Sequence, residues 1–156
     1  MNAPDAGLRF KVLDPRARVP ERKSALAAGL DLAACLPRGS VEQDVVTLEP
    51  GAIAMIPTGL AMAVNAGWEA QVRPRSGLAI RHGISVPNAP GTIDADYRGE
   101  LIVGLINLSP HAYEITHGLR IAQLVIAPVW TGDPVVVEEL DETDRGDRGF
   151  GSTGMR

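Results

Sequence analysis

The chain has 156 residues, a formal net charge of −4 and a pI of about 5.3, with 45% hydrophobic but only 4% aromatic residues. This length suits one domain, and the acidic balance argues against non-specific nucleic-acid binding. Cys35 is the only cysteine, which excludes an intrachain disulfide, and no run of 18 apolar residues occurs. We therefore expect a cytoplasmic protein that binds neither nucleic acid nor membrane.

Seventeen glycines and twelve prolines divide the sequence into short apolar or alternating runs. Runs of this kind, rich in Val and Ile and bounded by turn residues, predict strands. In chain order the expected strands are 8–13, 30–36, 44–50, 52–57, 60–64, 68–74, 100–108, 120–129 and 134–140. Together they predict an all-β jelly-roll-like sandwich or barrel.

One short helix is expected at 76–83, SGLAIRHG, with Ser76 as N-cap and Gly83 near its end. Arg75 precedes it, so backbone N–H groups, a hydroxyl and a guanidinium together form a candidate anion site. An ordinary N-cap beside a solvated arginine is the alternative. Neither GxxxxGK[ST] nor GxGxxG is present, which leaves no support for a P-loop or a Rossmann site.

Two polar residues interrupt expected strands. Asp31 in AGLDLAA is either a turn residue or a hard oxygen ligand for Mg²⁺, directly or through water. Gln123 in RIAQLVIAPV must find partners if it is buried, either on the main chain or on a ligand.

The segment PNAPGTIDADYRGE, 87–100, predicts a hairpin with many polar residues. Asp94 and Asp96 stand two apart, so on a strand both would point to one face. Two carboxylates held on one face repel each other unless a cation intervenes, which favours a functional site. A solvated hairpin with Asp in its turn is the alternative.

The chain ends in RGDRGFGSTGMR, residues 145–156, which shows no apolar period. It is either a frayed terminus or an anion clamp of arginines, hydroxyls and glycine N–H groups, in which Phe150 covers a flat ring. We expect a β domain at 1–140 and a flexible arm at 141–156.

In this order, AGLDL, PRSGLA, GTIDADYRG, RIAQL and RGxxGFGSTG resemble the five motifs of the trimeric dUTPases, from KVLDP to FGSTG. The resemblance implies a homotrimer whose active sites each draw on three chains. It also implies Mg²⁺-dependent hydrolysis of dUTP to dUMP and pyrophosphate, by in-line attack of water on the α-phosphorus. Such an activity keeps uracil out of DNA and supplies dUMP for thymidylate synthesis.

Residue by residue, the resemblance implies that Asp94 orients the water and takes its proton, and that Asp31 holds Mg²⁺ through coordinated waters. The implied substrate-binding residues are Arg75, Ser76, Gly77, Asn88, Thr92, Ile93, Asp94, Tyr97, Ile102, Gln123, Arg145, Phe150, Gly151, Ser152 and Thr153. Tyr97 would stack under the deoxyribose, and the tail would close as a flap over a neighbouring subunit. Arg148 departs from the family pattern, which has glycine there.

Two other functions fit the same motifs less well. A dCTP deaminase-like enzyme resembles the same fold but differs in the phosphate motif and the hairpin. A dUTP-sensing regulatory protein would bind the nucleotide without turnover, and the intact Asp31, Asp94 and Arg145 argue against it.

Overall fold

The computed structural model describes residues 5–37 and 44–147, and within them the chain is built of short strands with one helix. The predicted all-β sandwich with one short helix is confirmed. The strands are β1 Arg9–Val12, β2 Gly29–Ala33, β3 Val45–Leu48, β4 Ile53–Ala63, β5 Trp68–Pro74, β6 Ile84–Ser85, β7 Gly91–Ile93, β8 Glu100–Asn107, β9 Tyr113–Thr116 and β10 Arg120–Pro128, and the helix is α1 Ser76–His82.

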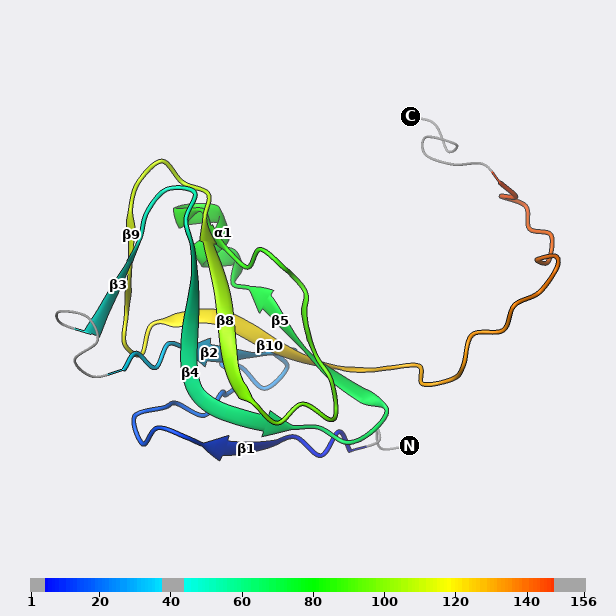
Figure 1. The fold of residues 1–156 in the computed structure, drawn as a ribbon, viewed down its shortest axis with the longest axis horizontal. Helices are drawn as coiled ribbons and strands as arrows, with labels where there is room; N and C mark the ends of the chain where they lie inside the picture. Colours follow the sequence, from blue (N-terminus) through cyan, green and yellow to red (C-terminus); the bar gives the residue numbers. More distant parts are fainter. Residues whose placement is uncertain (1–4, 38–43, 148–156) are drawn as a thin grey trace.

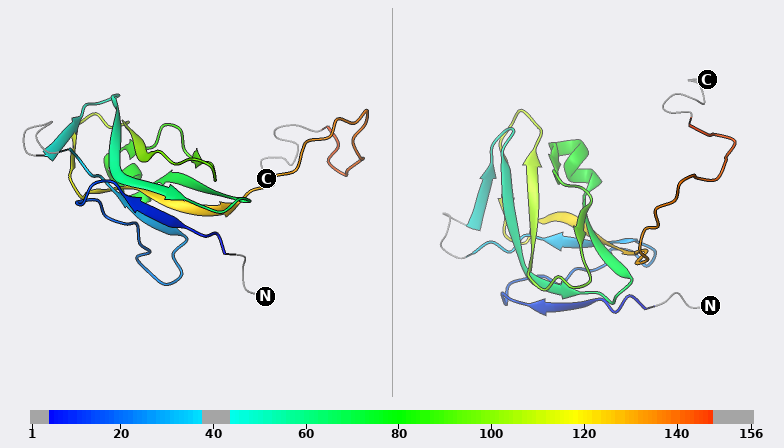
Figure 2. Two further views of the ribbon diagram at one scale, coloured as in Figure 1. Left: turned by 60° about the horizontal axis from the view of Figure 1, so that its bottom comes forward. Right: turned by 45° about the vertical axis from the view of Figure 1, so that its right-hand side comes forward.

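The strands form two four-stranded sheets and one two-stranded sheet, with antiparallel pairing throughout. The larger sheets have the orders β1-β4-β8-β6 and β2-β10-β5-β7, and β3 pairs with β9. In Figure 1, β4 and β8 stand side by side while β2 and β10 cross them, and Figure 2 shows the two sheets as stacked layers. Alternating Leu, Ile and Val side chains fill the space between them, and Leu32, Leu105 and Leu124 are fully buried.

The expected strands at 52–57 and 60–64 are one strand, β4, which bends between them. The bend falls where the pairing of β4 with β8 shifts register, between Pro57 and Ala61. Gly59 takes a left-handed φ of 68° there, and the hydroxyl of Thr58 donates to the carbonyl of Leu101 at 2.7 Å. Sequence patterns place a break at Pro57 and Gly59 because both residues usually end strands. Here they mark a bulge inside one strand.

Helix α1 lies where it was predicted, but its N-cap is Arg75 and not Ser76. No side chain caps the helix, and the serine lies one residue later, in the first turn. Gly83 ends the helix, as predicted, and takes the left-handed conformation. Within the described part of the chain, no helix is long and apolar enough to cross a membrane.

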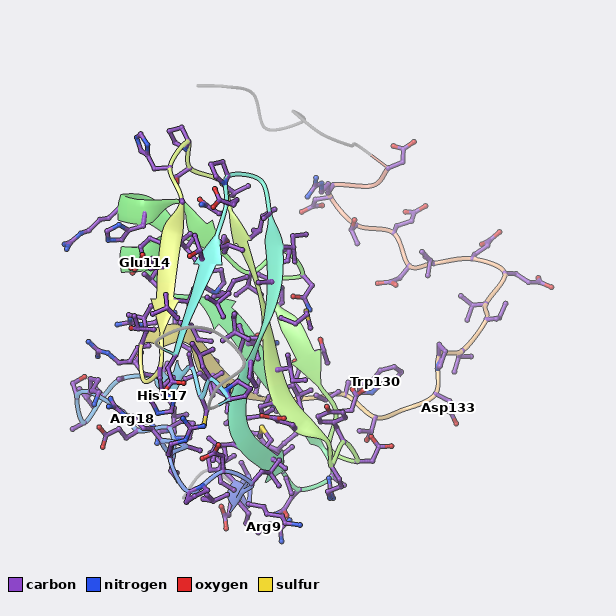
Figure 3. The ribbon with its side chains drawn as sticks, turned by 60° about the vertical axis from the view of Figure 1, so that its left-hand side comes forward. Arg9, Arg18, Glu114, His117, Trp130 and Asp133 are labelled. Carbon is purple, nitrogen blue, oxygen red and sulfur yellow. The ribbon has the colours of Figure 1, made fainter. Side chains whose placement is uncertain are left out.

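Segment 111–118, which lies between two expected strands and was not itself expected to form one, contains β9 and completes the small sheet with β3. Glu114 lies within β9, and His117 follows it next to Arg18 (Figure 3). Arg18 donates to the carbonyl of Gly118 at 3.4 Å, which ties the end of this sheet to the loop after β1.

The prediction of a strand at 134–140 is wrong. The described residues 129–147 contain no strand and extend away from the two sheets (Figure 1). Val136 is 97% exposed, and Trp130 and Asp133 lie where this segment leaves the body (Figure 3). The preference of valine for strands reflects packing on a half-buried sheet, and no sheet lies beside this segment within the chain.

Candidate functional site

A first pocket, of about 410 Å³, surrounds the carboxylate of Asp31, and we call it the Asp31 pocket. Three adjacent strands of one sheet, β2, β10 and β5, bring its residues together, although they are far apart in the sequence. Its lining consists of Lys23, Ala27, Ala28, Gly29, Asp31, Arg75, Ser76, Gly77, Arg120 and Gln123.

Asp31 is held between two arginines. Arg75 Nε lies 3.1 Å from Oδ1, and Arg120 Nη1 lies 2.7 Å from Oδ2. The Asp31 side chain is only 16% exposed, so these pairs are partly shielded from water. Arg75 also donates to the carbonyl of Arg120 at 2.9 Å, which links the two arginines to each other. The result is a connected group of two guanidinium ions and one carboxylate.

Gln123 is opposite Asp31 in the register of β10 with β2. Its side-chain amide donates to the carbonyl of Pro74 at 2.9 Å, so of the two expected kinds of partner the structure shows one on the main chain. A Cβ at Gly29 would overlap the Gln123 side-chain oxygen, so a larger residue there would displace Gln123. Ser76 and Gly77 are exposed at the start of α1, which Leu78 anchors in the core.

The lining of the Asp31 pocket carries three cationic side chains and one carboxylate. This balance favours a polyanionic ligand. The described residues contain no group of three or more His, Cys, Asp or Glu that could enclose a metal ion. A single carboxylate nevertheless suits Mg²⁺, which keeps several waters and takes few protein ligands when substrate phosphates supply the rest. Because both Asp31 oxygens already accept from arginines, the donor set fits an ion that would be held through its coordinated waters and not by direct ligation.

A second pocket, of about 460 Å³, lies between β7 and β8, and we call it the Asp94 pocket. Its walls are mostly apolar, with a few polar groups at the turn and at Asn88. The lining includes all the predicted residues of the 87–102 region, namely Asn88, Thr92, Ile93, Asp94, Tyr97 and Ile102. An apolar pocket with a few polar groups is typical of a small-molecule site.

The hairpin expected at 87–100 is not a paired hairpin. Strand β7 pairs with β5 in one sheet, whereas β8 pairs with β4 and β6 in the other. The connection therefore crosses between the sheets, and the Asp94 pocket occupies the space between its two arms. Asp94 and Asp96 lie in the turn beyond the end of β7, not on one strand face, and Asp96 is absent from the pocket lining.

Tyr97 is fixed by its neighbours in this turn. Its hydroxyl donates to the carbonyl of Glu100 at 2.8 Å, and its N–H donates to the carbonyl of Asp94 at 3.1 Å. The Glu100 carboxylate accepts the N–H of Gly59 at 2.8 Å, which joins the turn to the bend of β4. Tyr97 is 43% exposed, so part of the residue is accessible to a ligand.

Three charged residues of these pockets are not among those predicted from the sequence: Lys23, Arg120 and Glu100. Arg120 begins the RIAQL motif and Glu100 follows YRG, so motif position could have indicated both. Lys23 stands in the loop ERKSALAAG, outside the recognised motifs, so motif position does not indicate it.

The predicted residues divide between the two pockets, and the pockets share none of their lining residues. Arg145 lies on the exposed segment beyond β10 and lines neither pocket. Phe150, Gly151, Ser152 and Thr153, like Arg148, lie outside the described residues.

Comparisons with known proteins agree on one family. A family model described as dUTPase matches residues 15–154. The deoxyuridine 5′-triphosphate nucleotidohydrolase of Desulfotalea psychrophila is 58% identical over 88% of this chain and 87% of its own length. That of Roseobacter denitrificans is 53% identical over 90% of both chains.

Solved structures give the same result. A mutant of the Staphylococcus bacteriophage 80alpha dUTPase, solved with dUpNHpp, superimposes with a TM-score of 0.82 at 30% identity. It covers 94% of this chain and 98% of its own. A mutant dUTPase from phage phi11 of S. aureus, described with a structural Mg(II) ion, has a TM-score of 0.75 at 27% identity, covering 86% and 99% of the two chains.

Proposed function

This chain belongs to the dUTPase family and is a dUTP diphosphatase, and from that premise we propose how its two pockets divide the substrate. The Asp94 pocket takes deoxyuridine and the Asp31 pocket takes the triphosphate. Hydrolysis yields dUMP and pyrophosphate, which keeps uracil out of DNA and supplies dUMP for thymidylate synthesis. The observation that carries this proposal is the division of the predicted site residues into one mostly apolar pocket and one cationic pocket.

The nucleoside half of the proposal rests on the shape and polarity of the Asp94 pocket. Asn88 and the backbone near Ile102 would hydrogen-bond the edge of uracil between the separated arms of β7 and β8. The neighbouring walls would exclude the methyl group of thymine. The Tyr97 ring, held by its bond to the Glu100 carbonyl, would lie under the deoxyribose and leave no room for a 2′-hydroxyl.

The chemical step needs positioning and charge neutralisation more than covalent catalysis. Asp94 is exposed at the turn, where its carboxylate could orient a water molecule for in-line attack on the α-phosphorus and accept its proton. The phosphate oxygens would be bound by Arg75, Ser76, Gly77 and Gln123. The Arg75 guanidinium would stabilise the negative charge that moves onto pyrophosphate. Asp31 would hold Mg²⁺ through coordinated waters. When bound, the ion would neutralise further phosphate charge.

We also propose that the active site is shared in a cytoplasmic homotrimer. One feature supports sharing: the described part of the segment after β10 extends away from its own body (Figure 1). Residues 141–156 would form an arm over a neighbouring subunit, bringing Arg145, Phe150, Gly151, Ser152 and Thr153 to the nucleotide.

A pyrophosphate-release assay on dUTP, dCTP, UTP and dTTP tests the substrate assignment. Rapid turnover of dUTP alone is expected, because only uracil on deoxyribose fits the Asp94 pocket as proposed. Asp94→Asn should abolish turnover and leave dUTP affinity nearly unchanged, because the amide keeps the shape but cannot accept the proton. A loss of affinity large enough to explain the whole rate defect would contradict the role of Asp94.

A subunit-mixing experiment tests the shared site. Asp94→Asn subunits and subunits lacking 145–156 are unfolded together in equal amounts and reassembled at random. About three quarters of the trimers are then mixed, and each has one site with both parts intact, which restores about 25% of wild-type activity. No recovery, with mixed trimers confirmed by native mass spectrometry, would exclude a site that joins Asp94 to the arm of another subunit.

A further inference from the structure

The loop that precedes β2 is folded against the Asp31 pocket by its own hydrogen bonds. The N–H of Asp31 donates to the carbonyl of Glu21 at 3.2 Å, in an isolated bridge that fixes the base of the loop. Arg22 Nε donates to the carbonyl of Ala27 at 2.9 Å and closes the loop from the other side. Lys23, near the tip, lines the Asp31 pocket together with Ala27.

Lys23 differs from the two arginines of the pocket in the partner it holds. Arg75 and Arg120 both bind the partly buried carboxylate of Asp31. The Lys23 ammonium instead pairs with Glu21, two residues away on the same loop, and this contact lowers the pKa of Glu21. The Lys23 and Glu21 side chains are 51% and 70% exposed, and Glu21 is absent from the pocket lining. An exposed pair of this kind is weak and exchanges readily with another anion.

We propose that Lys23 is a further substrate-binding residue, whose ammonium leaves Glu21 and binds the phosphate oxygens of dUTP in the Asp31 pocket. This inference rests on the proposed function of that pocket. Asp31 already neutralises part of the charge of Arg75 and Arg120. A third cation that is not paired with a buried carboxylate would therefore strengthen the binding of a triphosphate. Lysine suits the exchange because it carries a compact charge on a flexible stem.

The test compares two lysine substitutions, since Lys11 is the only other lysine in the chain and is exposed on β1. Affinity is measured by calorimetry for dUpNHpp and for 2′-deoxyuridine, which has no phosphate. Lys23→Met should weaken dUpNHpp about tenfold, the effect of losing one hydrogen bond to a charged group, and leave 2′-deoxyuridine unchanged. Lys11→Met should change neither affinity. Equal dUpNHpp affinities for the two variants would overturn the proposal.

Substitution of Glu21 separates ligand binding from a structural role of the ion pair. Glu21→Gln frees the ammonium, so it should tighten dUpNHpp binding by about twofold, opposite in sign to Lys23→Met. Lys23→Arg should keep most of the affinity. Weaker binding in Glu21→Gln, parallel to Lys23→Met, would show that the pair only supports the loop. Lys23→Gln repeats the measurement if the methionine variant lowers the unfolding temperature.

The two levels of inference fail differently. If Arg75→Met, measured in the same way, leaves the affinity for dUpNHpp unchanged, the triphosphate does not lie in the Asp31 pocket and the proposed function is wrong. If Arg75→Met weakens dUpNHpp binding and Lys23→Met behaves like Lys11→Met, only the role of Lys23 is wrong.

Discussion

Replacing Gly59 with alanine perturbs the bend of β4 at a point where the fold and the Asp94 pocket are connected. Gly59 has a φ of 68°, and a Cβ there would lie 2.9 Å from both Ala17 Cβ and Cys35 Sγ. Gly51 is a matched control, because it has a similar φ of 76° and a Cβ there would meet nothing within 4 Å. The two substitutions share the backbone penalty and differ only in crowding.

The expected magnitudes follow from these contacts. An alanine in the left-handed region costs about 1–2 kcal/mol, and this applies to both variants. Gly59→Ala adds overpacking against the buried Cys35 and the partly buried Ala17, which costs about 1–3 kcal/mol more. For a protein of this size, that difference corresponds to an unfolding temperature about 2–12 °C lower for Gly59→Ala than for Gly51→Ala.

Differential scanning calorimetry at equal protein concentration measures the difference, since association would make the unfolding temperature depend on concentration. A functional effect should accompany it. The Gly59 N–H donates to Glu100, whose carbonyl accepts the Tyr97 hydroxyl, so a shifted bend should reduce the preference for dUTP over UTP. Gly51→Ala should keep that preference. Equal losses of stability in the two variants would refute the crowding argument.

Three further predictions concern single side chains. Tyr97→Ala should shrink the ratio of dUTP to UTP turnover, and a fall in dUTP activity at an unchanged ratio would exclude Tyr97 as the sugar gate. A hydrogen bond from Arg16 lowers the pKa of Asp14 below its ordinary value of 3.8. This pair therefore stabilises the fold above pH 3.8, and the stabilisation is lost as the pH falls through the lowered pKa. Arg16→Met should therefore lower the urea midpoint at pH 7, and the gap from wild type should narrow in acid, whereas a constant gap would contradict the linkage. Cys35 is 4% exposed, and burial raises the pKa of its thiol. A thiol reagent should therefore label Cys35 only as fast as the protein unfolds, and immediate labelling in native buffer would contradict its burial.

The sequence by itself determined the local elements and the chemistry of the site. The strand preference of short runs such as 68–74 and 120–129 can be recognised from a few neighbouring residues. The end of the helix at Gly83 can be recognised in the same way. The residue types around Asp31 and Asp94 are likewise visible in the motifs, because a carboxylate or a guanidinium has its chemistry wherever it stands.

Only the tertiary structure decided which of these groups meet. Asp31 is bound by arginines 44 and 89 positions away, and no local pattern carries that information. The two arms of the 87–100 segment separate because β7 pairs with β5, whereas β8 pairs with β4. The valines of 135–137 remain exposed because no strand edge lies beside them. The physical reason is that strand preference is a property of a few neighbouring residues, whereas pairing depends on which edges the whole chain leaves adjacent.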